Sequence, residues 1–422
     1  MPAGDGWGWG PEHPSWVLSG VVESPLRGRC IALGVTGSAA IYKALDLARM
    51  LLRMGASVYT VVSPAAARLV SPSLFEWATG LPAVTEMTGR IEHVSLARRC
   101  DAVLVAPATL NTLAEIAGLG ASNTVTALAQ EALGLGKPLL LVPAMHGGMW
   151  VRARKAVEEI EAAGGYVLRP LLETGQAKFP DPWLVAWWAE AIIERGRDLE
   201  GVTVYVNAGP TLERLDAVRV ITNPSTGLMG VSIALEAAWR GARVRLVHGP
   251  LRCCWWRGWK SYLEAVDAVE TTEEMLEKTL ERIRGVDMAF YAAAVADYRP
   301  AEPLEGKHPT ASGRLTVELE PTPKVAPRAV EAEPSAVHVG FAAEPLTGDR
   351  LVEKAFEKLH RYRLDAVAAN STLEPGSAFA SETNHVYLVT RGGKVYEIPK
   401  AHKRLVARRL LDHALRLLEE KR

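Results

Sequence analysis

Short apolar runs alternate with amphipathic segments along most of this chain. In the first half, apolar runs typical of buried strands fall at residues 31–35, 58–62, 102–106 and 139–143. Apolar residues recur at helical spacing at residues 39–54, 110–117, 124–133 and 184–195. Strands that are apolar on both faces and alternate with helices are typical of a parallel sheet covered on both sides. The pattern therefore predicts an α/β domain.

The second half repeats this alternation after a charged stretch at residues 194–200. Strands are expected near Val204 and Val244 and at residues 288–291, 337–341 and 366–368, then a hairpin of residues 386–390 and 395–398. A basic amphipathic helix, expected to be solvated, closes the chain from Lys400. We therefore predict an α/β fold of two Rossmann-like domains with mainly parallel sheets, at residues 27–196 and 197–422.

The first 26 residues have a different composition. They are rich in Gly, Pro and Trp and show no periodicity, which predicts a flexible tail. The alternative is that their tryptophans dock on a neighbour.

The charge balance and the cysteines narrow the classes of function. The 422 residues include 48 basic and 48 acidic side chains, so no net field attracts nucleic acid or an anionic membrane. Without a signal peptide or an apolar run of about 18 residues, we expect a cytoplasmic soluble protein. The cysteines show neither zinc spacing nor a disulfide framework. Cys30 and Cys100 are predicted to be small core residues.

Each half opens with a strand, a glycine-bearing turn and a helix. The first such unit begins at residues 29–37 and the second at residues 202–210. These turns present backbone N–H groups at a helix N-terminus, where a phosphate fits. A dinucleotide site also needs an acidic residue about 20 residues further on. The second strands end instead in Val62-Ser63-Pro64 and His248-Gly249-Pro250, which favours two mononucleotide sites over a dehydrogenase.

Three strand ends in the first half carry residues suited to a flavin. Gly37 and Ser38 follow the first strand, and Thr109 and Asn111 follow the third. Ligands of open α/β sheets sit outside the carboxyl ends of strands, where these neutral groups would face a flavin ring edge. The fourth strand leads to His146, the only titratable side chain in its segment.

Several spaced motifs of the first half resemble the phosphopantothenoylcysteine decarboxylase family. The matching segments are Thr36-Gly37-Ser38, Tyr42-Lys43, Glu92-His93-Val94 and residues 75–80, 106–112 and 143–150. The resemblance implies a flavodoxin-like half that uses FMN to oxidise the substrate thiol, so that carbon dioxide can leave. It also implies a catalytic His93. The implied FMN-binding residues are Gly37, Ser38, Ser63, Thr109 and Asn111.

The first half departs from the family at two places. Bacterial members carry Asn at the position of His146, where it grips the substrate carboxylate, so His146 is expected in that catalytic role. They also use a flap cysteine as the final proton donor, and residues 173–179 contain none. Lys178 or His146 is the hypothetical donor.

The second half carries a different set of strand ends. Residues 208–211 end its first strand, and a Ser/Thr/Gly cluster at residues 222–230 leads into a helix whose N–H groups suit phosphate. Residues 291–298 close another strand with small residues and one acid, Asp297. Small residues let a flat base lie against the backbone. The candidate counter-charges for phosphate are Lys307, Lys324 and Lys358.

These segments resemble the phosphopantothenate–cysteine ligase family over residues 201–413. The matching pieces are residues 208–211, 221–230, 293–300, 321–325, 339–344 and 369–370, with Lys307 and Asn384. The resemblance implies that CTP activates the phosphopantothenate carboxylate as an acyl-cytidylate and that the cysteine amine then attacks it. Mg²⁺ would bridge the phosphates, held mostly by substrate and water, with its protein ligands unknown. The implied catalytic residues are Asn223 and Lys307, and the implied nucleotide-binding residues are Ala292, Ala293, Asp297, Lys307, Pro323, Lys324, Phe341 and Lys358.

This half departs from its family as well. Pro224 stands where the family often has Arg or Lys, and residues 307–310 replace a lysine-rich run, so nucleotide choice stays open. The aromatic insertion at residues 253–260 is interpreted as a loop that packs on a partner subunit, with a flavin or base platform as the alternative.

Together the resemblances predict a bifunctional enzyme of coenzyme A biosynthesis that forms a homo-oligomer. Two alternatives remain. One is a different flavin reaction such as prenyl-flavin synthesis, and the other is a flavin-binding regulatory protein without decarboxylase activity.

Overall fold

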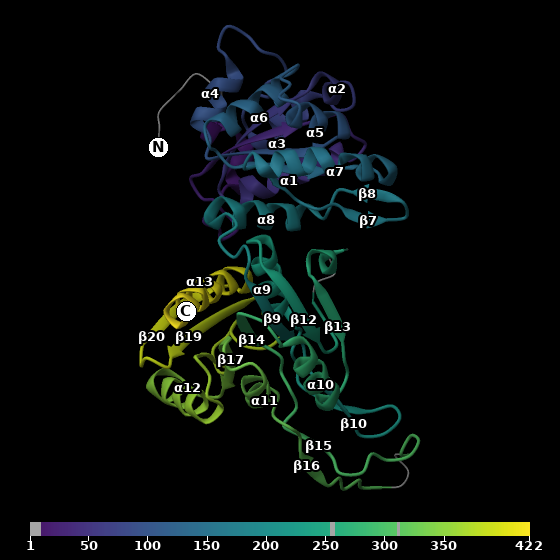
Figure 1. Cartoon of the computed structure of the whole chain (residues 1–422), viewed down its shortest axis with the longest axis vertical. Helices are drawn as coiled ribbons and strands as arrows, with labels where there is room; N and C mark the ends of the chain where they lie inside the picture. The colour runs from purple at the N-terminus through teal and green to yellow at the C-terminus, as the bar shows by residue number, and fades with distance from the viewer. Residues whose placement is uncertain (1–9, 254–257, 310–312) are drawn as a thin grey trace. The chain divides into compact units, whose positions relative to one another are not determined.

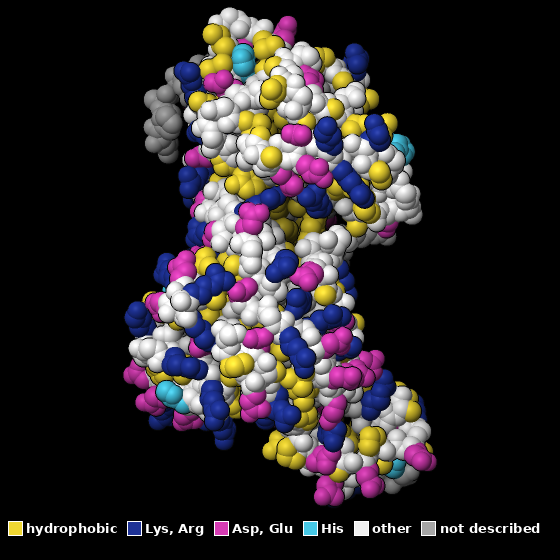
Figure 2. All heavy atoms as spheres, in the orientation of Figure 1, with side chains coloured by type: hydrophobic (Ala, Val, Ile, Leu, Met, Phe, Trp, Pro, Cys, Tyr) yellow, Lys and Arg dark blue, Asp and Glu magenta, His cyan; other side chains and the backbone are white. Residues whose placement is uncertain are grey.

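The computed structural model describes residues 10–253, 258–309 and 313–422. The chain divides after Gly196 into two compact units, and the second runs from Arg197 to Arg422 apart from residues 258–261 (Figure 1). Each unit is an α/β domain with a mainly parallel sheet, which confirms the predicted fold class. Basic and acidic side chains are interspersed over the face shown in Figure 2. No helix among the described residues is long and apolar enough to span a membrane.

The first unit is built on a five-stranded parallel sheet. Its strand order is β2-β1-β3-β4-β6, the flavodoxin order, in which the chain reverses direction across the sheet between β1 and β3. The strands are β1 (Cys30–Val35), β2 (Ser57–Val62), β3 (Ala102–Ala108), β4 (Leu139–Pro143) and β6 (Tyr166–Val167). Ligands of such sheets bind where the order reverses, so the topology points to the carboxyl ends of β1 and β3.

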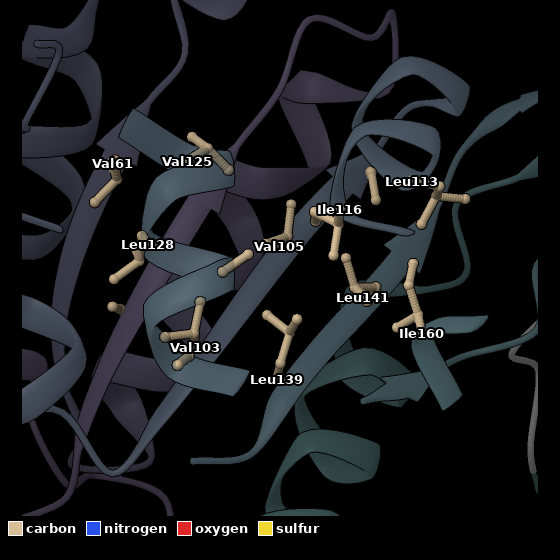
Figure 3. Packing of buried hydrophobic residues seen from close by; sticks show 14 of the residues in the cluster. Val61, Val103, Val105, Leu113, Ile116, Val125, Leu128, Leu139, Leu141 and Ile160 are labelled. Atoms are coloured by element: carbon tan, nitrogen blue, oxygen red, sulfur yellow. The ribbon is translucent and has the colours of Figure 1, made fainter. Parts of the chain in front are cut away.

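Helices cover both faces of this sheet. One layer holds α1 (Ile41–Arg53), α3 (Pro72–Thr79) and α8 (Pro182–Arg195), and the other holds α4 (Glu92–Arg99), α5 (Leu110–Ala117), α6 (Thr124–Gly134) and α7 (Gly147–Ala162). Alternate residues of β3, Val103 and Val105, pack into the second layer (Figure 3). Gly34 of β1 lets α6 approach closely, because a Cβ there would lie 2.8 Å from Val125 Cγ1.

Residues 10–26 correct the expected flexible tail. They form two short 3-10 helices, Gly10–Glu12 and Pro14–Leu18. The indole of Trp16 donates a hydrogen bond to the Thr79 carbonyl at 2.9 Å, at the end of α3, and Leu26 is fully buried. An aromatic side chain covering a helix end therefore anchors this segment. Residues 1–9 lie outside the described part of the chain.

A disulfide bond between Cys30 and Cys100 corrects the expectation that no such bond exists. Cys30 begins β1, and Cys100 follows α4 just before β3. The parallel register of the two strands pairs Ile31 with Ala102. That register brings the two cysteines to a Cα–Cα distance of 4.4 Å across 70 residues of sequence.

The second unit is built on an eight-stranded sheet. Its order is β13-β12-β9-β14-β17-β18-β19-β20, and only β19 runs antiparallel to its neighbours. The strands are β9 (Thr203–Ala208), β12 (Arg243–His248), β13 (Ala265–Ala268), β14 (Met288–Tyr291), β17 (Val337–Glu344), β18 (Ala366–Ser371), β19 (Thr383–Thr390) and β20 (Val395–His402). Its first six strands have the Rossmann order, which reverses between β9 and β14.

Two helix layers cover this sheet. One consists of α9 (Leu228–Trp239) and α13 (Lys403–Lys421), which pack on each other, and the other of α10 (Thr272–Arg282), α11 (Val325–Ala332) and α12 (Gly348–Tyr362). The expectation of a solvated closing helix is wrong for the first turns of α13. There Arg408 is buried and pairs with Glu236 of α9 at 2.6 Å.

Candidate functional sites

The carboxyl ends of β1 and β3 meet at the switch point of the first unit. The Thr36 hydroxyl donates a hydrogen bond to the Pro107 carbonyl at 2.8 Å and ties the two strand ends together. Gly37 lies against the start of α2 (Pro64–Ala67), where a Cβ would come within 2.7 Å of Ala65 Cβ. Only glycine fits this close approach, and residues 37 and 38 are half-buried.

Hydroxyl groups cap the neighbouring helices. Ser63, at the end of β2, accepts a hydrogen bond from the Ala66 N–H at 3.2 Å. Thr109, at the end of β3, accepts one from the Thr112 N–H at 3.3 Å, and Asn111 is exposed in the first turn of α5. The structure thus places all five predicted flavin-binding residues at the ends of three adjacent strands, and this neutral donor set fits an FMN.

His93 comes from the first turn of α4 and not from a strand end. Glu92 fixes this turn by accepting a hydrogen bond from the Thr88 N–H at 2.8 Å and another from its hydroxyl. The Nδ1 atom of His93 is buried and has no hydrogen-bond partner among the described residues. A buried polar atom without a partner costs free energy, so it is a candidate to receive a bond from a ligand.

His146 and Lys178 share the small antiparallel sheet formed by β5 (Met145–His146), β7 (Leu171–Glu173) and β8 (Gln176–Lys178). His146 is exposed and lies opposite Gln176. Because side chains two residues apart in a strand share a face, Lys178 is a diagonal neighbour of His146 on the same face. Lys178 forms an ion pair with Glu173 at 2.8 Å.

The second unit contains a pocket of about 600 Å³ at the carboxyl edge of its sheet. Its walls come from the ends of β9, β14, β17 and β18, from the N-terminus of α9 and from the segment before β19. The predicted site residues that line it are Asn223, Ala292, Ala293, Asp297, Lys324, Phe341 and Lys358. The structure therefore brings together seven residues that are separated by up to 135 positions in the sequence (358 − 223).

Two asparagines order the centre of this pocket. The Asn223 amide donates to the Ala294 carbonyl at 3.0 Å. Asn207, buried at the end of β9, accepts from the Ala293 N–H at 2.9 Å. These bonds hold the strand end 292–294 in place. The Asn223 side-chain oxygen accepts no hydrogen bond from the residues that the structure describes, and Asn223 lines the pocket.

One end of the pocket is the N-terminus of α9. Gly227 precedes the helix with φ at 83°, and a Cβ there would come within 2.3 Å of Leu251 Cδ2. Ser225 and Thr226 accept bonds from the Gly227 and Leu228 N–H groups at 3.3 and 3.4 Å. The first N–H groups of a helix lack intrahelical partners and attract anions. This end of the pocket is therefore suited to phosphate or carboxylate.

Charged groups lie along the opposite wall. Asp297 and Lys324 form an exposed ion pair. Lys358 reaches in from α12 and donates to the Phe341 carbonyl at 2.6 Å. Burial lowers the pKa of the Lys358 ammonium below its ordinary value, because removal from water disfavours the charged form.

Two predicted residues do not line the pocket. Pro323 is adjacent to Lys324 but is not part of the wall. Lys307 is exposed in the connection between β15 (Tyr298–Pro300) and β16 (Leu319–Pro321), so its role stays a prediction. Among the residues that the structure describes, no three His, Cys, Asp or Glu side chains are grouped to hold a metal ion.

Sequence reasoning assigned no role to several residues of the pocket wall. Asn207, Asn370, Phe379 and Lys403 all line it. Asn370 was part of a matching motif, but Phe379 and Lys403 carry no local signal. They come from a loop and from a helix N-terminus that only the tertiary fold brings to the site.

Two family models match the chain. The model described as DNA/pantothenate metabolism flavoprotein C-terminal domain (DFP) matches residues 199–418. The model described as Flavoprotein matches residues 20–186. The two matches meet near the division between the compact units.

Curated relatives and solved structures are similar to this chain. The coenzyme A biosynthesis bifunctional protein CoaBC of Thermococcus kodakarensis is 38% identical over 409 residues, which cover 93% of this chain and 96% of that protein. The CoaBC of Escherichia coli is 31% identical over 414 residues, covering 94% and 99%. The crystal structure of a CoaBC C-terminal domain covers 53% of this chain and 99% of that one, at 31% identity and a TM-score of 0.44. The FMN binding protein AtHal3 covers 38% and 94%, at 23% identity and a TM-score of 0.33.

Proposed function

Because the chain belongs to the family of coenzyme A biosynthesis bifunctional proteins, we propose that it catalyses two successive reactions. The second unit joins 4′-phosphopantothenate to cysteine at the expense of CTP. The first unit then uses FMN to decarboxylate the product to 4′-phosphopantetheine. The observation that carries this proposal is the occurrence, in one chain, of flavin-suited strand ends and a separate pocket with an anion-binding end.

The pocket of the second unit supports the ligation chemistry. A carboxylate is a poor electrophile, and a nucleotidyl ester gives it a good leaving group. In this proposal, the Asn223 side chain orients the substrate carboxylate and the N-terminus of α9 stabilises developing negative charge. Lys358 and the small residues 292–293 contact the nucleotide. Mg²⁺ is held mainly by the phosphates and water.

The first unit supports decarboxylation of a cysteine-derived carboxylate. An FMN, when bound, supplies the two-electron oxidation and reduction that side chains lack. Residues 37–38 and Thr109 bind and orient it through backbone and hydroxyl groups at the switch point. His93 exchanges a proton with the substrate through its imidazole, and His146 grips the substrate carboxylate.

The proposal is tested with the purified full-length chain. We expect yellow protein with bound FMN that releases pyrophosphate from CTP only when phosphopantothenate is present. Mass spectrometry after incubation with phosphopantothenate, cysteine and CTP should show phosphopantetheine. Protein that stays colourless after reconstitution with FMN would contradict the decarboxylase assignment.

A second candidate function follows from the absence of cysteine at residues 173–179. Without that proton donor, the first unit could serve as a flavin-binding regulatory domain. Carbon dioxide release by the wild type but not by His93→Ala would exclude this alternative. A regulatory protein would release none in either form.

Two side chains on the small sheet of β5, β8 and β7 are candidates for the missing proton donor. His146 and Lys178 lie on one face of it, so either could protonate the enethiolate that decarboxylation leaves. We expect His146→Ala or Lys178→Ala to accumulate this enethiol in place of phosphopantetheine. Full turnover by both variants would show that neither is the donor.

The proposal extends to the oligomeric state and the cellular location of the protein. We propose a homo-oligomer that acts in the cytoplasm on small-molecule substrates. Light scattering of the purified chain should give a mass that is a multiple of 45.7 kDa, and the monomer mass would contradict the proposed assembly.

A further inference from the structure

One wall of the pocket in the second unit is a loop in which two residues other than glycine have positive φ angles. Ala378, Phe379 and Ala380, between β18 and β19, all line the pocket. We call these three residues the shelf. Both alanines have positive φ, 68° and 53°, a conformation that side chains with a Cβ disfavour. Strained backbone of this kind persists only where the surroundings over-determine it.

Two buried polar residues hold the shelf. The Asn384 side-chain oxygen accepts hydrogen bonds from the Ser377 hydroxyl at 2.9 Å and from the Ala378 N–H at 3.1 Å. The Lys403 ammonium donates to the Ala378 carbonyl at 2.9 Å. Asn384 is 3% exposed and Lys403 is 4% exposed. The N–H and carbonyl groups of Ala378 are thus both held by residues of the pocket wall.

The position of Lys403 is energetically unfavourable for a charged side chain. It begins α13, where the helix dipole disfavours a cation. It is buried, and no acidic side chain among the described residues pairs with it. Burial of an unpaired ammonium costs free energy, and the hydrogen bond that this ammonium makes goes to the shelf.

The pocket has two chemically different ends. The α9 end offers the hydroxyls of Ser225 and Thr226, which cap Gly227 and Leu228. It also offers the next N–H groups of the helix, which have no intrahelical partner. Phe341 of β17 and Asn370 of β18 line the pocket next to β19, on the side of Phe379 and away from β9 and α9. The Asn370 Nδ2 atom has no hydrogen-bond partner within the described residues. A flat heterocycle needs such a combination of apolar surface and edge donor, whereas a phosphate does not.

We propose that the shelf is the wall of the pocket that packs against the nucleobase, with Phe379 as a specificity-determining contact and Lys403 and Asn384 as its positioning residues. This proposal rests on the proposed nucleotide-dependent ligation. Phe379 is 37% exposed for an apolar ring, and a base would cover it. The rigid shelf keeps the ring oriented before the nucleotide binds, which reduces the entropy lost on binding.

The test compares Phe379→Ala with the wild type in the full chain. Pyrophosphate release is measured against CTP concentration, and inhibition by inorganic tripolyphosphate is measured in the same assay. Stacking of one base on one aromatic ring corresponds to about a tenfold change in binding. We expect the KM for CTP to rise about tenfold, with kcat and the tripolyphosphate inhibition constant unchanged. Phe379→Tyr should restore the KM.

The loop itself offers a matched control. Leu373 lies in the same connection, is 63% exposed and is not part of the pocket wall. Leu373→Ala should leave the KM unchanged. The proposal is overturned if Phe379→Ala leaves the KM for CTP unchanged, or if it weakens CTP and tripolyphosphate equally.

The positioning role of Lys403 has its own control. Lys400 also donates to a backbone carbonyl of this loop, that of Pro375, but it is exposed and outside the pocket. We expect Lys403→Met to raise the KM for CTP about as much as Phe379→Ala, with no further rise in the double variant. Lys400→Met should have no effect. Additive effects of Lys403→Met and Phe379→Ala would overturn the assigned coupling.

Failure of the proposed function gives a different result. If the wild type releases no pyrophosphate from CTP in the presence of phosphopantothenate, the ligase assignment is wrong. Calorimetric titration of CTP and ATP into the wild type and Phe379→Ala then tests the shelf directly. Equal nucleotide affinity in both proteins, or no binding to either, would overturn the shelf proposal.

Discussion

Both units have their candidate site where the strand order of the sheet reverses. The elements that supply the other residues of the site differ between the two units. In the second unit, the pocket is walled by strand ends, by the N-termini of α9, α11 and α13, by α12 and by the shelf. In the first unit, the strand ends supply only glycine, hydroxyl and amide groups. Its two candidate histidines lie on α4 and on the small sheet at β5. The switch point of an α/β sheet thus fixes where a ligand binds, while loops and helices decide the chemistry.

The two candidate sites also differ in their charged side chains. The second pocket is lined by three lysines, Lys324, Lys358 and Lys403, and by two acids, Asp297 and Glu344. The strand ends of the first unit are neutral, as a flavin ring requires. If each unit works by itself, a substitution in one site should leave the reaction of the other unchanged.

The largest effect is expected from His93→Ala. A positioned general acid or base contributes roughly 10²–10⁴ in rate, so carbon dioxide release should fall about 1000-fold. Pyrophosphate release from CTP should stay unchanged. His360→Ala, an exposed histidine of α12, serves as the control. Loss of both activities in His93→Ala would contradict the independence of the units.

Glu236→Ala tests whether the units fold independently. The substitution leaves Arg408 buried beside α9 without its carboxylate partner, and breaking a buried ion pair typically costs about 3 kcal/mol. We expect the unfolding transition of the second unit to shift to lower denaturant, with flavin release unchanged. Glu281→Ala, in an exposed pair with Lys278, should cause no measurable shift. A common shift of both transitions would show that the units unfold together.

Asn223→Asp should impair the ligase alone. The substitution keeps the size of the side chain but replaces the donor facing the Ala294 carbonyl with an acceptor. It also repels the substrate carboxylate. We expect kcat/KM for phosphopantothenate to fall about 30-fold, which corresponds to about 2 kcal/mol. An equal fall in decarboxylation, measured with purified phosphopantothenoylcysteine, would refute a separate second site.

Lys403 gives the smallest predicted effect, a change in the pH dependence of stability. Burial lowers the pKa of the Lys403 ammonium to about 8. Below that pH, both the folded and unfolded chains carry the proton. As the pH rises toward the ordinary lysine pKa of about 10.5, the folded chain releases it first and becomes relatively more stable.

Lys403→Met removes this contribution. The free energy of unfolding of the variant, relative to the wild type, should therefore fall by about 1 kcal/mol between pH 7 and pH 9. Chemical denaturation at both pH values measures the difference. A constant difference would mean that the Lys403 pKa is not lowered.

The hydrophobic pattern was sufficient to predict the sheets. Runs such as residues 102–106 are apolar at every position, and they form the central strand β3. The strand ends followed from this, because glycine, threonine and asparagine directly after such a run have few structural uses besides turns, caps and ligand contacts. The α/β class and the strand-end position of the flavin-suited residues were therefore accessible from sequence.

Long-range contacts were not accessible in this way. The disulfide between Cys30 and Cys100 depends on the register of β1 and β3, and the docking of Trp16 depends on where α3 ends. The shelf needs a helix N-terminus to come beside a loop 25 residues earlier in the chain. None of these has a local pattern, since each is created by packing of elements distant in sequence.

The central claim is that each unit carries its own single-nucleotide site. Equilibrium titration of CTP into the FMN-loaded chain, with flavin absorbance recorded throughout, tests it most directly. We predict one FMN and one CTP bound per chain at the same time, with no flavin released at saturating CTP. Displacement of FMN by CTP, or binding of one NAD in place of both, would contradict the account.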